Sequence, residues 1–206
     1  MKNRLRQQYV GLKVCWDSGL KDHFFRATAA FFILIAVFFV LGLTVPRIQE
    51  NFLKMMDSAL LSVSDETGSI DGTYLLANNI SACGFIMLYG FLPFFRLSAF
   101  SLGVNAMVLG STLAWYVQNG VSLWIYFAAI VPHGIVEFPA MFLSFGMGLL
   151  ICDNVTRRLR KDETALTPWA CMVWMARVHL LLLVPLLAAA AVLEAYVTPW
   201  VLNLLL

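Results

Sequence analysis

The sequence has few charged residues, and its few cysteines are not spaced for a metal site. Only 13% of the 206 residues are Asp, Glu, Lys or Arg, whereas 61% are hydrophobic and the mean hydropathy is +0.80. This composition excludes an ordinary soluble domain and is typical of a polytopic membrane protein. The four cysteines include no CxxC pair, so neither a zinc site nor a disulfide framework is predicted.

Several signatures of catalysis and ligand binding are also missing. The sequence contains no nucleophile elbow, P-loop or dinucleotide fingerprint. Its basic residues lie at the ends of apolar runs instead of forming one patch, which argues against nucleic acid as a partner. We therefore expect a protein that is not an enzyme and that needs no cofactor.

Long apolar runs dominate what the sequence does contain. Because about 20 apolar residues in a helix cross the ~30 Å hydrocarbon core of a bilayer, the runs predict an all-α membrane helix bundle with five transmembrane spans. The first run ends without a small-x-small cleavage site, which favours a retained helix over a signal peptide. The predicted spans, within a single transmembrane domain at 27–206, are about 27–45, 74–95, 97–117, 121–151 and 173–198.

The charges between the runs predict an orientation. Residues 1–26 interleave basic with apolar side chains, as in an interfacial segment on the cytoplasmic leaflet, and the loop 152–168 holds three arginines and a lysine. The segment between Pro46 and Gly72 is acidic, and its apolar residues at 48–63 recur at helical spacing. We therefore predict a cytoplasmic N-terminus, an extracytoplasmic C-terminus and an extracytoplasmic amphipathic helix, which rests on the membrane or docks an external partner.

The fourth run is interrupted by the octapeptide Pro-His-Gly-Ile-Val-Glu-Phe-Pro at residues 132–139. His133 and Glu137 are four residues apart, so on a helix they share one face. An ionisable group at membrane depth costs several kcal/mol unless it is paired or hydrated. This face should therefore point into the protein.

The two prolines of the octapeptide predict a distortion of the same span. Neither Pro132 nor Pro139 can donate the backbone hydrogen bond that a helix requires, and Gly134 adds conformational freedom. We expect the helix to be kinked or broken between about Ala128 and Pro139.

Other polar residues fall at comparable depths along their spans. Counting ~1.5 Å per residue places Glu194, Asn78 and Asn79 in the outer half of the membrane, and Asn105 lies near the middle of the third span. We predict one intramembrane polar cluster that faces the bundle interior, and the alternative is a hydrogen-bond network that only fixes helix register. The candidate residues are His133, Glu137, Glu194, Asn78, Asn79 and Asn105.

A metal site is not predicted at this cluster. His133 and Glu137 are weak candidate ligands, because a zinc site generally recruits three protein ligands and an HxxxE spacing supplies only two. In the third span, the pairs Ala99-xxx-Gly103 and Ala106-xxx-Gly110 instead indicate close helix packing, for which dimerisation is one use.

Four of these elements together resemble the stage II sporulation protein M family, over roughly residues 27 to 200. They are Asn78-Asn79, Asn105-x-x-x-x-Gly110, Pro132-His133-Gly134-x-x-Glu137-x-Pro139 and Glu194-Ala195-x-x-Thr198-Pro199. The resemblance implies an integral scaffold of the bacterial cytoplasmic membrane that works with two cell-wall hydrolases during engulfment of the forespore. Similar proteins occur widely in bacteria that never sporulate.

Three functions of different classes follow. A membrane scaffold or assembly protein of the cell envelope is favoured by the resemblance, with the bilayer, cell-wall hydrolases or other envelope proteins, or a second copy as partners. A transporter or lipid-handling protein would explain a broken helix beside intramembrane carboxylates, although no inverted repeat is evident. An intramembrane metallohydrolase would use His133 and Glu137 as metal ligands or as a base, but two residues are fewer than the three protein ligands that a zinc site generally recruits.

Overall fold

The computed structural model describes residues 2–45, 47, 49–50, 54 and 72–205, and within these ranges the protein is helical and contains no strand. This confirms the predicted all-α class. Four helical stretches are long and apolar enough to cross a membrane, and the helix at 75–91 is apolar but shorter. A membrane protein with several apolar helices is therefore supported, whereas the count of five spans stays a prediction.

The helices follow one another along the chain with short connections. Their bounds are α1 Lys2–Cys15, η1 Trp16–Leu20, α2 Lys21–Thr44, α4 Gly72–Leu88, η2 Tyr89–Phe91, α5 Leu97–Gln118, α6 Leu123–Leu159, α7 Pro168–Val178, η3 His179–Leu183, α8 Val184–Val192, η4 Leu193–Val197 and α9 Thr198–Asn203.

The longest helix, α6, is the centre of the bundle. In its most apolar stretch 61% of the residues are buried, compared with 33% in α5 and 17% in the spans formed by α2 and by α7 to α9. One core cluster joins α6 to α4 and the C-terminal helices, and a second joins it to α2 and α5. The short side chains of Ala140, Ser144 and Gly148 allow this, since Ser144 donates to the Cys83 carbonyl of α4 at 2.7 Å.

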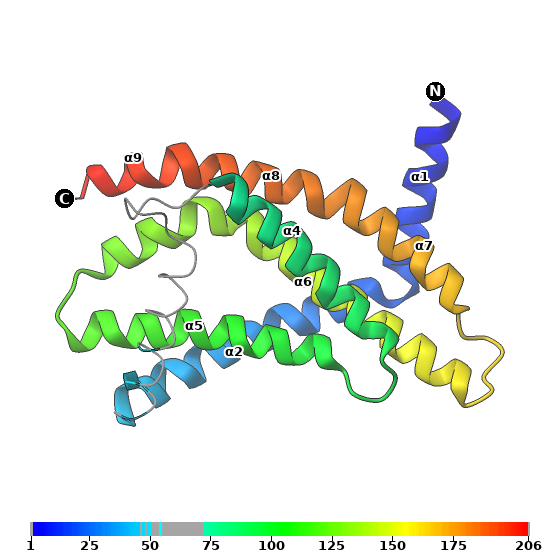
Figure 1. The fold of residues 1–206 in the computed structure, drawn as a ribbon, viewed down its shortest axis with the longest axis horizontal. Helices are drawn as coiled ribbons and strands as arrows, with labels where there is room; N and C mark the ends of the chain where they lie inside the picture. The colour runs from blue at the N-terminus through cyan, green and yellow to red at the C-terminus, as the bar shows by residue number, and fades with distance from the viewer. Residues whose placement is uncertain (1, 46, 48, 51–53, 55–71, 206) are drawn as a thin grey trace.

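The two prolines do not interrupt α6, which runs from Leu123 to Leu159 with Pro132 and Pro139 inside it. The expected break is therefore absent from this helix. The course of α6 changes direction in its N-terminal part (Figure 1). A kink caused by the missing proline donors stays a prediction.

The C-terminal helices form one course from Pro168 to Asn203 that is widened twice by π-helical turns, η3 and η4. Pro185 is the second residue after η3, and its missing N–H removes one α-helical hydrogen bond there. The turn η4 carries Glu194. Since π-helical turns are frequent at functional sites, η4 bears directly on the predicted polar cluster.

Several predicted boundaries shift. The helix α6 extends to Leu159, so the loop predicted at 152–168 shrinks to residues 160–167. The last span is preceded by helical residues from Pro168, because Thr167 caps that helix by accepting a hydrogen bond from the Ala170 N–H. Most of the amphipathic helix predicted at 48–63, all but residues 49, 50 and 54, lies outside the described residues.

One end of the bundle brings together three short segments, two of which carry basic residues. There η1, the turn at 92–96 and the loop 160–167 lie together, and α1 leaves the bundle at a steep angle (Figure 1). We call this the basic end. Gly19, with φ of 122°, makes the bend between α1 and α2 in a backbone conformation that favours glycine.

Candidate functional site

The helix α6 presents His133 and Glu137 on one face, one turn apart. Their side chains are 17% and 20% exposed, and His133 Nε2 lies 3.9 Å from Glu137 Oε2. That distance is within range of an ion pair but too long for a direct hydrogen bond. The pair is thus held at an electrostatic contact that a small rotation of either side chain would tighten.

Two neighbouring helices complete the site. Asn79 of α4 donates from Nδ2 to Glu137 Oε1 at 3.3 Å, and His133 Nδ1 lies 3.4 Å from the Thr198 hydroxyl of α9. Asn79, Glu137, His133 and Thr198 therefore form a continuous polar chain across three helices. We call these four residues the polar chain.

Glu194 lies beside the polar chain but is not bonded to it. It sits in η4, one helical turn before Thr198, and is half-buried. Its carboxylate is close enough to interact electrostatically with both His133 and Glu137. Within the described part of the chain, Glu194 makes no hydrogen bond or ion pair.

The structure places two predicted members elsewhere. Asn78 and Asn105 line a separate groove of about 380 Å³ between α4 and α5, and Asn105 donates to the Ser101 carbonyl of its own helix at 2.9 Å. The structure does not bring Asn105 to the other predicted members, because α5 packs mainly on α2. Asn78 points away from Glu137 because consecutive residues on a helix are separated by ~100°.

The groove between α4 and α5 has a mixed lining. Its polar members are Asn78, Ser81, Ser101 and Asn105, and its apolar members include large, exposed side chains. Phe100 is 72% exposed and Phe85 57%. The two helices diverge from the turn that joins them (Figure 1).

One member of the polar chain was missed by the sequence reasoning. Thr198 is buried and reaches His133, yet it drew attention only as part of the Glu194-Ala195-x-x-Thr198-Pro199 pattern. Its spacing of four residues from Glu194 was the available signal, because both then lie on one helix face.

The chemistry of the polar chain is that of a carboxyl and an imidazole held by two neutral groups. Such a chain locks three helices in register, and it can also pass a proton between Glu137 and His133 if a water bridges their 3.9 Å separation. Among the described residues no three His, Cys, Asp or Glu side chains converge as metal ligands. His133 and Glu137 are thus a pair without a third ligand in that part of the chain.

Comparison with known proteins places the chain in a family. The model of the family described as stage II sporulation protein M matches residues 27–199. An uncharacterized protein of Methanocaldococcus jannaschii is 29% identical over 175 residues, which cover 84% of this chain and 97% of that protein. No solved structure matches. The matched residues contain the whole polar chain and the groove, and the chain belongs to the stage II sporulation protein M family.

Proposed function

We propose that this protein is an integral membrane scaffold of the bacterial cell envelope that binds another membrane protein through the groove between α4 and α5. The groove carries the proposal because it brings amide side chains to an outer surface of two apolar helices. By the resemblance, the expected partners are cell-wall hydrolases or the membrane proteins that recruit them. The positive-inside rule predicts that the N-terminus lies in the cytoplasm and the C-terminus outside.

Lipid is a poor occupant for this groove. Asn78 is exposed and makes no hydrogen bond to any residue that the structure describes, and Asn105 uses only its amide nitrogen, on a carbonyl of its own helix. Hydrocarbon offers these amides no partner, and hydrogen bonds between membrane helices contribute about 0.6 to 2 kcal/mol each. A transmembrane helix with small or polar residues at its contact face would satisfy them.

The aromatic side chains of the groove supply the apolar part of such a contact. Phe100 and Phe85 project from facing helices with most of their surface uncovered. Between membrane helices the gain comes from van der Waals packing, to which a large ring contributes many contacts. The groove thus combines polar groups that require a partner with rings that can pack on one.

The test compares two exposed aromatic residues. Phe100 lines the groove and is 72% exposed, whereas Trp124 at the start of α6 is 74% exposed and lies outside it. Phe100→Ala should lower the yield of a co-purifying membrane protein about tenfold at matched abundance, because a central aromatic contact often carries 1 to 2 kcal/mol or more of binding. Trp124→Ala should leave the yield unchanged. Equal yields from both variants and the wild type would remove the support for the proposal.

A second function, transport or lipid handling, is favoured by one observation, the polar chain at membrane depth. Such intramembrane carboxylates commonly mark ion or substrate paths. The two functions separate cleanly. A scaffold needs the groove and tolerates a neutral residue at Glu137, whereas a proton-coupled transporter needs the carboxyl and is indifferent to Phe100→Ala.

A further inference from the structure

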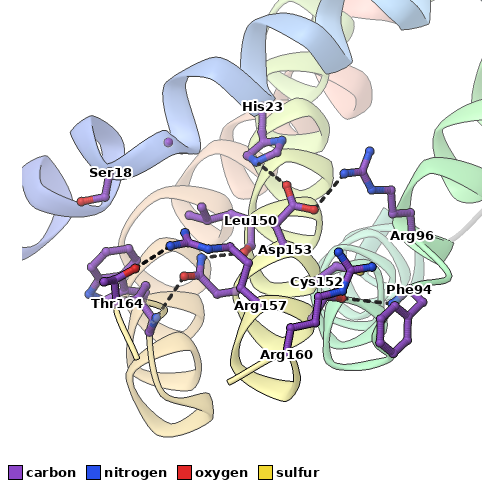
Figure 2. A pocket seen from close by; sticks show the side chains of 15 residues that line it. Ser18, His23, Phe94, Arg96, Leu150, Cys152, Asp153, Arg157, Arg160 and Thr164 are labelled. Carbon is purple, nitrogen blue, oxygen red and sulfur yellow. Dashed lines mark hydrogen bonds and ion pairs between the residues drawn. The ribbon is translucent and has the colours of Figure 1, made fainter. Parts of the chain in front are cut away.

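A second polar region lies at the basic end of the bundle and takes no part in the polar chain. It is a cavity of about 640 Å³ enclosed by η1, α2, the turn at 92–96, α6, the loop 160–167 and α7 (Figure 2). Ligand pockets in proteins commonly measure ~300 to 1,000 Å³. The size is therefore sufficient for a small organic anion or a lipid headgroup.

The lining of this cavity is basic. Arg96, Arg157 and Arg160 face a single carboxylate, Asp153, which leaves two more positive than negative charges when His23 is neutral. Asp162 pairs with Arg157 from outside the lining at 2.7 Å and reduces the surplus to one. Hydrogen bonds from Thr164 and then Arg157 lower the pKa of Asp162 to about 2, so this pairing persists at neutral pH.

Among the residues that the structure describes, Arg160 is the cation of the cavity lining that has no carboxylate partner. Its guanidinium carbon lies 5.6 Å from the centre of the Phe94 ring, and it forms no ion pair with the residues that the structure describes. Stacking on an aromatic face holds a guanidinium in place and leaves its N–H groups free at the edge. Those donors form the fork that matches a phosphate or carboxylate.

Arg96 is held at the cavity by a different device. Its Nη2 donates to Asp153 Oδ1 at 2.9 Å, while His23 Nε2 lies 3.4 Å from the other Asp153 oxygen. Figure 2 shows Asp153 between these two partners, which come from α2 and from the turn at 92–96. A guanidinium fixed through one nitrogen keeps its remaining donors for a ligand.

Backbone strain gathers at the same place. The non-glycine residues with positive φ in the described part of the chain are Phe94 at 70°, Arg96 at 46° and Lys161 at 64°. Phe94 and Arg96 line the cavity, and Lys161 directly follows Arg160. Such conformations are unfavourable for residues other than glycine and cluster at ligand sites, because they persist only where the surroundings impose them.

The inner wall of the cavity is apolar and belongs to the membrane-spanning helices. It is formed by Leu150 of α6, Trp174 of α7 and Leu166 of the adjoining loop. By the positive-inside rule this end lies at the cytoplasmic leaflet, where anionic lipids reside. Basic pockets between helices on that side suit the headgroups of such lipids.

We propose that this cavity is a binding site for a phosphate group carried by an anionic ligand, with Arg160 and Arg96 donating hydrogen bonds to the phosphate oxygens. The phosphate comes from a phospholipid headgroup of the cytoplasmic leaflet or from a soluble phosphate compound. The chemistry of recognition is the same in both cases. The proposal is independent of the scaffold function, since no residue of the groove between α4 and α5 contributes to this cavity.

The test uses the full chain purified in neutral detergent and titrated with phosphatidylglycerol, phosphatidylcholine or inorganic phosphate, with occupancy read by native mass spectrometry. Removing one arginine near an anionic group weakens binding about fivefold, so Arg160→Gln should show that loss and Arg160→Lys a smaller one. The matched control is Arg158→Gln, on the same helix end but outside the cavity, where Arg158 donates to the Glu163 carbonyl. It should change binding less than twofold.

The probes separate the two sources. Preference for phosphatidylglycerol over phosphatidylcholine, lost in Arg160→Gln, assigns a lipid headgroup. Binding of inorganic phosphate with the same variant pattern, without preference between the lipids, assigns a soluble ligand. If no anionic probe is preferred, or if Arg158→Gln weakens binding as much as Arg160→Gln, the proposal is wrong. Arg96→Gln provides a second variant should Arg160→Gln not yield monodisperse protein.

Discussion

Replacing Gly110 by alanine should separate two helices that the structure packs backbone to backbone. A Cβ at this position would lie 2.5 Å from the Ile35 carbonyl oxygen and 2.9 Å from the Phe38 Cβ, both in α2. Gly103, two turns earlier on α5, has no atom within 4 Å of the equivalent position. The same substitution at the two sites therefore differs only in what the added methyl group meets.

The size of the effect follows from that geometry. Restoring an ordinary carbon to oxygen separation of ~3.5 Å from 2.5 Å requires α2 and α5 to move apart by about 1 Å, which forfeits a quarter to a half of the local dispersion energy. Overpacking of this kind typically costs about 1 to 3 kcal/mol. Both variants gain up to about 1 kcal/mol from helix propensity, so their difference isolates the packing cost.

The assay is thermal unfolding of the full chain in detergent, followed by the loss of the monodisperse peak in size-exclusion chromatography. A deficit of about 2 kcal/mol lowers Tm by about 4 to 8 °C for a protein of this size. Gly110→Ala should unfold below Gly103→Ala by that amount, and Gly103→Ala should equal or exceed the wild type. If Gly110→Ala is as stable as the wild type, or if the two variants fall together, the close approach of α2 and α5 is refuted.

Three further predictions concern the polar chain, the orientation and the loop. Glu137→Gln keeps the shape of the side chain and the hydrogen bond to Asn79, so its stability should stay close to that of the wild type, whereas Glu137→Ala should lower the stability by about 1 to 3 kcal/mol. If both variants lose function completely at matched abundance, the transporter is favoured. Cysteines introduced at Asp65 and Thr164 should react with an impermeant reagent from opposite sides of the membrane, and labelling of both in intact cells lacking any outer barrier would contradict the orientation. Because the folded pKa of Asp162, about 2, lies below its usual value of 3.8, its contribution to loop order should be full above pH 3.8 and lost as the pH falls towards 2. Asp162→Asn should therefore speed amide exchange of Thr164 at neutral pH, while unchanged exchange would show that the loop does not need this carboxylate.

The local parts of the site were accessible from the sequence, because they depend on helix periodicity alone. Apolar runs predicted the helical membrane class, and the spacing of His133 and Glu137 predicted a shared face. Which asparagine meets Glu137 depends on how α4 rotates about its own axis. That rotation is fixed by packing of the small face of α6, so Asn79 could not be chosen over Asn78 in advance.

Contacts between residues from distant segments could not be predicted from the sequence for a similar reason. His23, Arg96 and Asp153 come from three separate parts of the chain, and each looks like an ordinary flanking charge on its own. The conformation of the turn at 92–96, with positive φ at Arg96, decides that the guanidinium reaches Asp153. The residue types in that turn do not predict this conformation, since the turn contains neither glycine nor asparagine, which favour positive φ.

The most direct test of the scaffold function is photo-crosslinking from the groove in living cells. A photoreactive residue replaces Val104, which lines the groove and is 37% exposed, or Val37, which is 44% exposed on α2. We expect position 104 to crosslink to a different membrane protein and position 37 to yield only lipid adducts. Crosslinks from position 104 to lipid alone, to residues 46–71 of the same chain or to a second copy would contradict it, as would equal protein adducts from both positions.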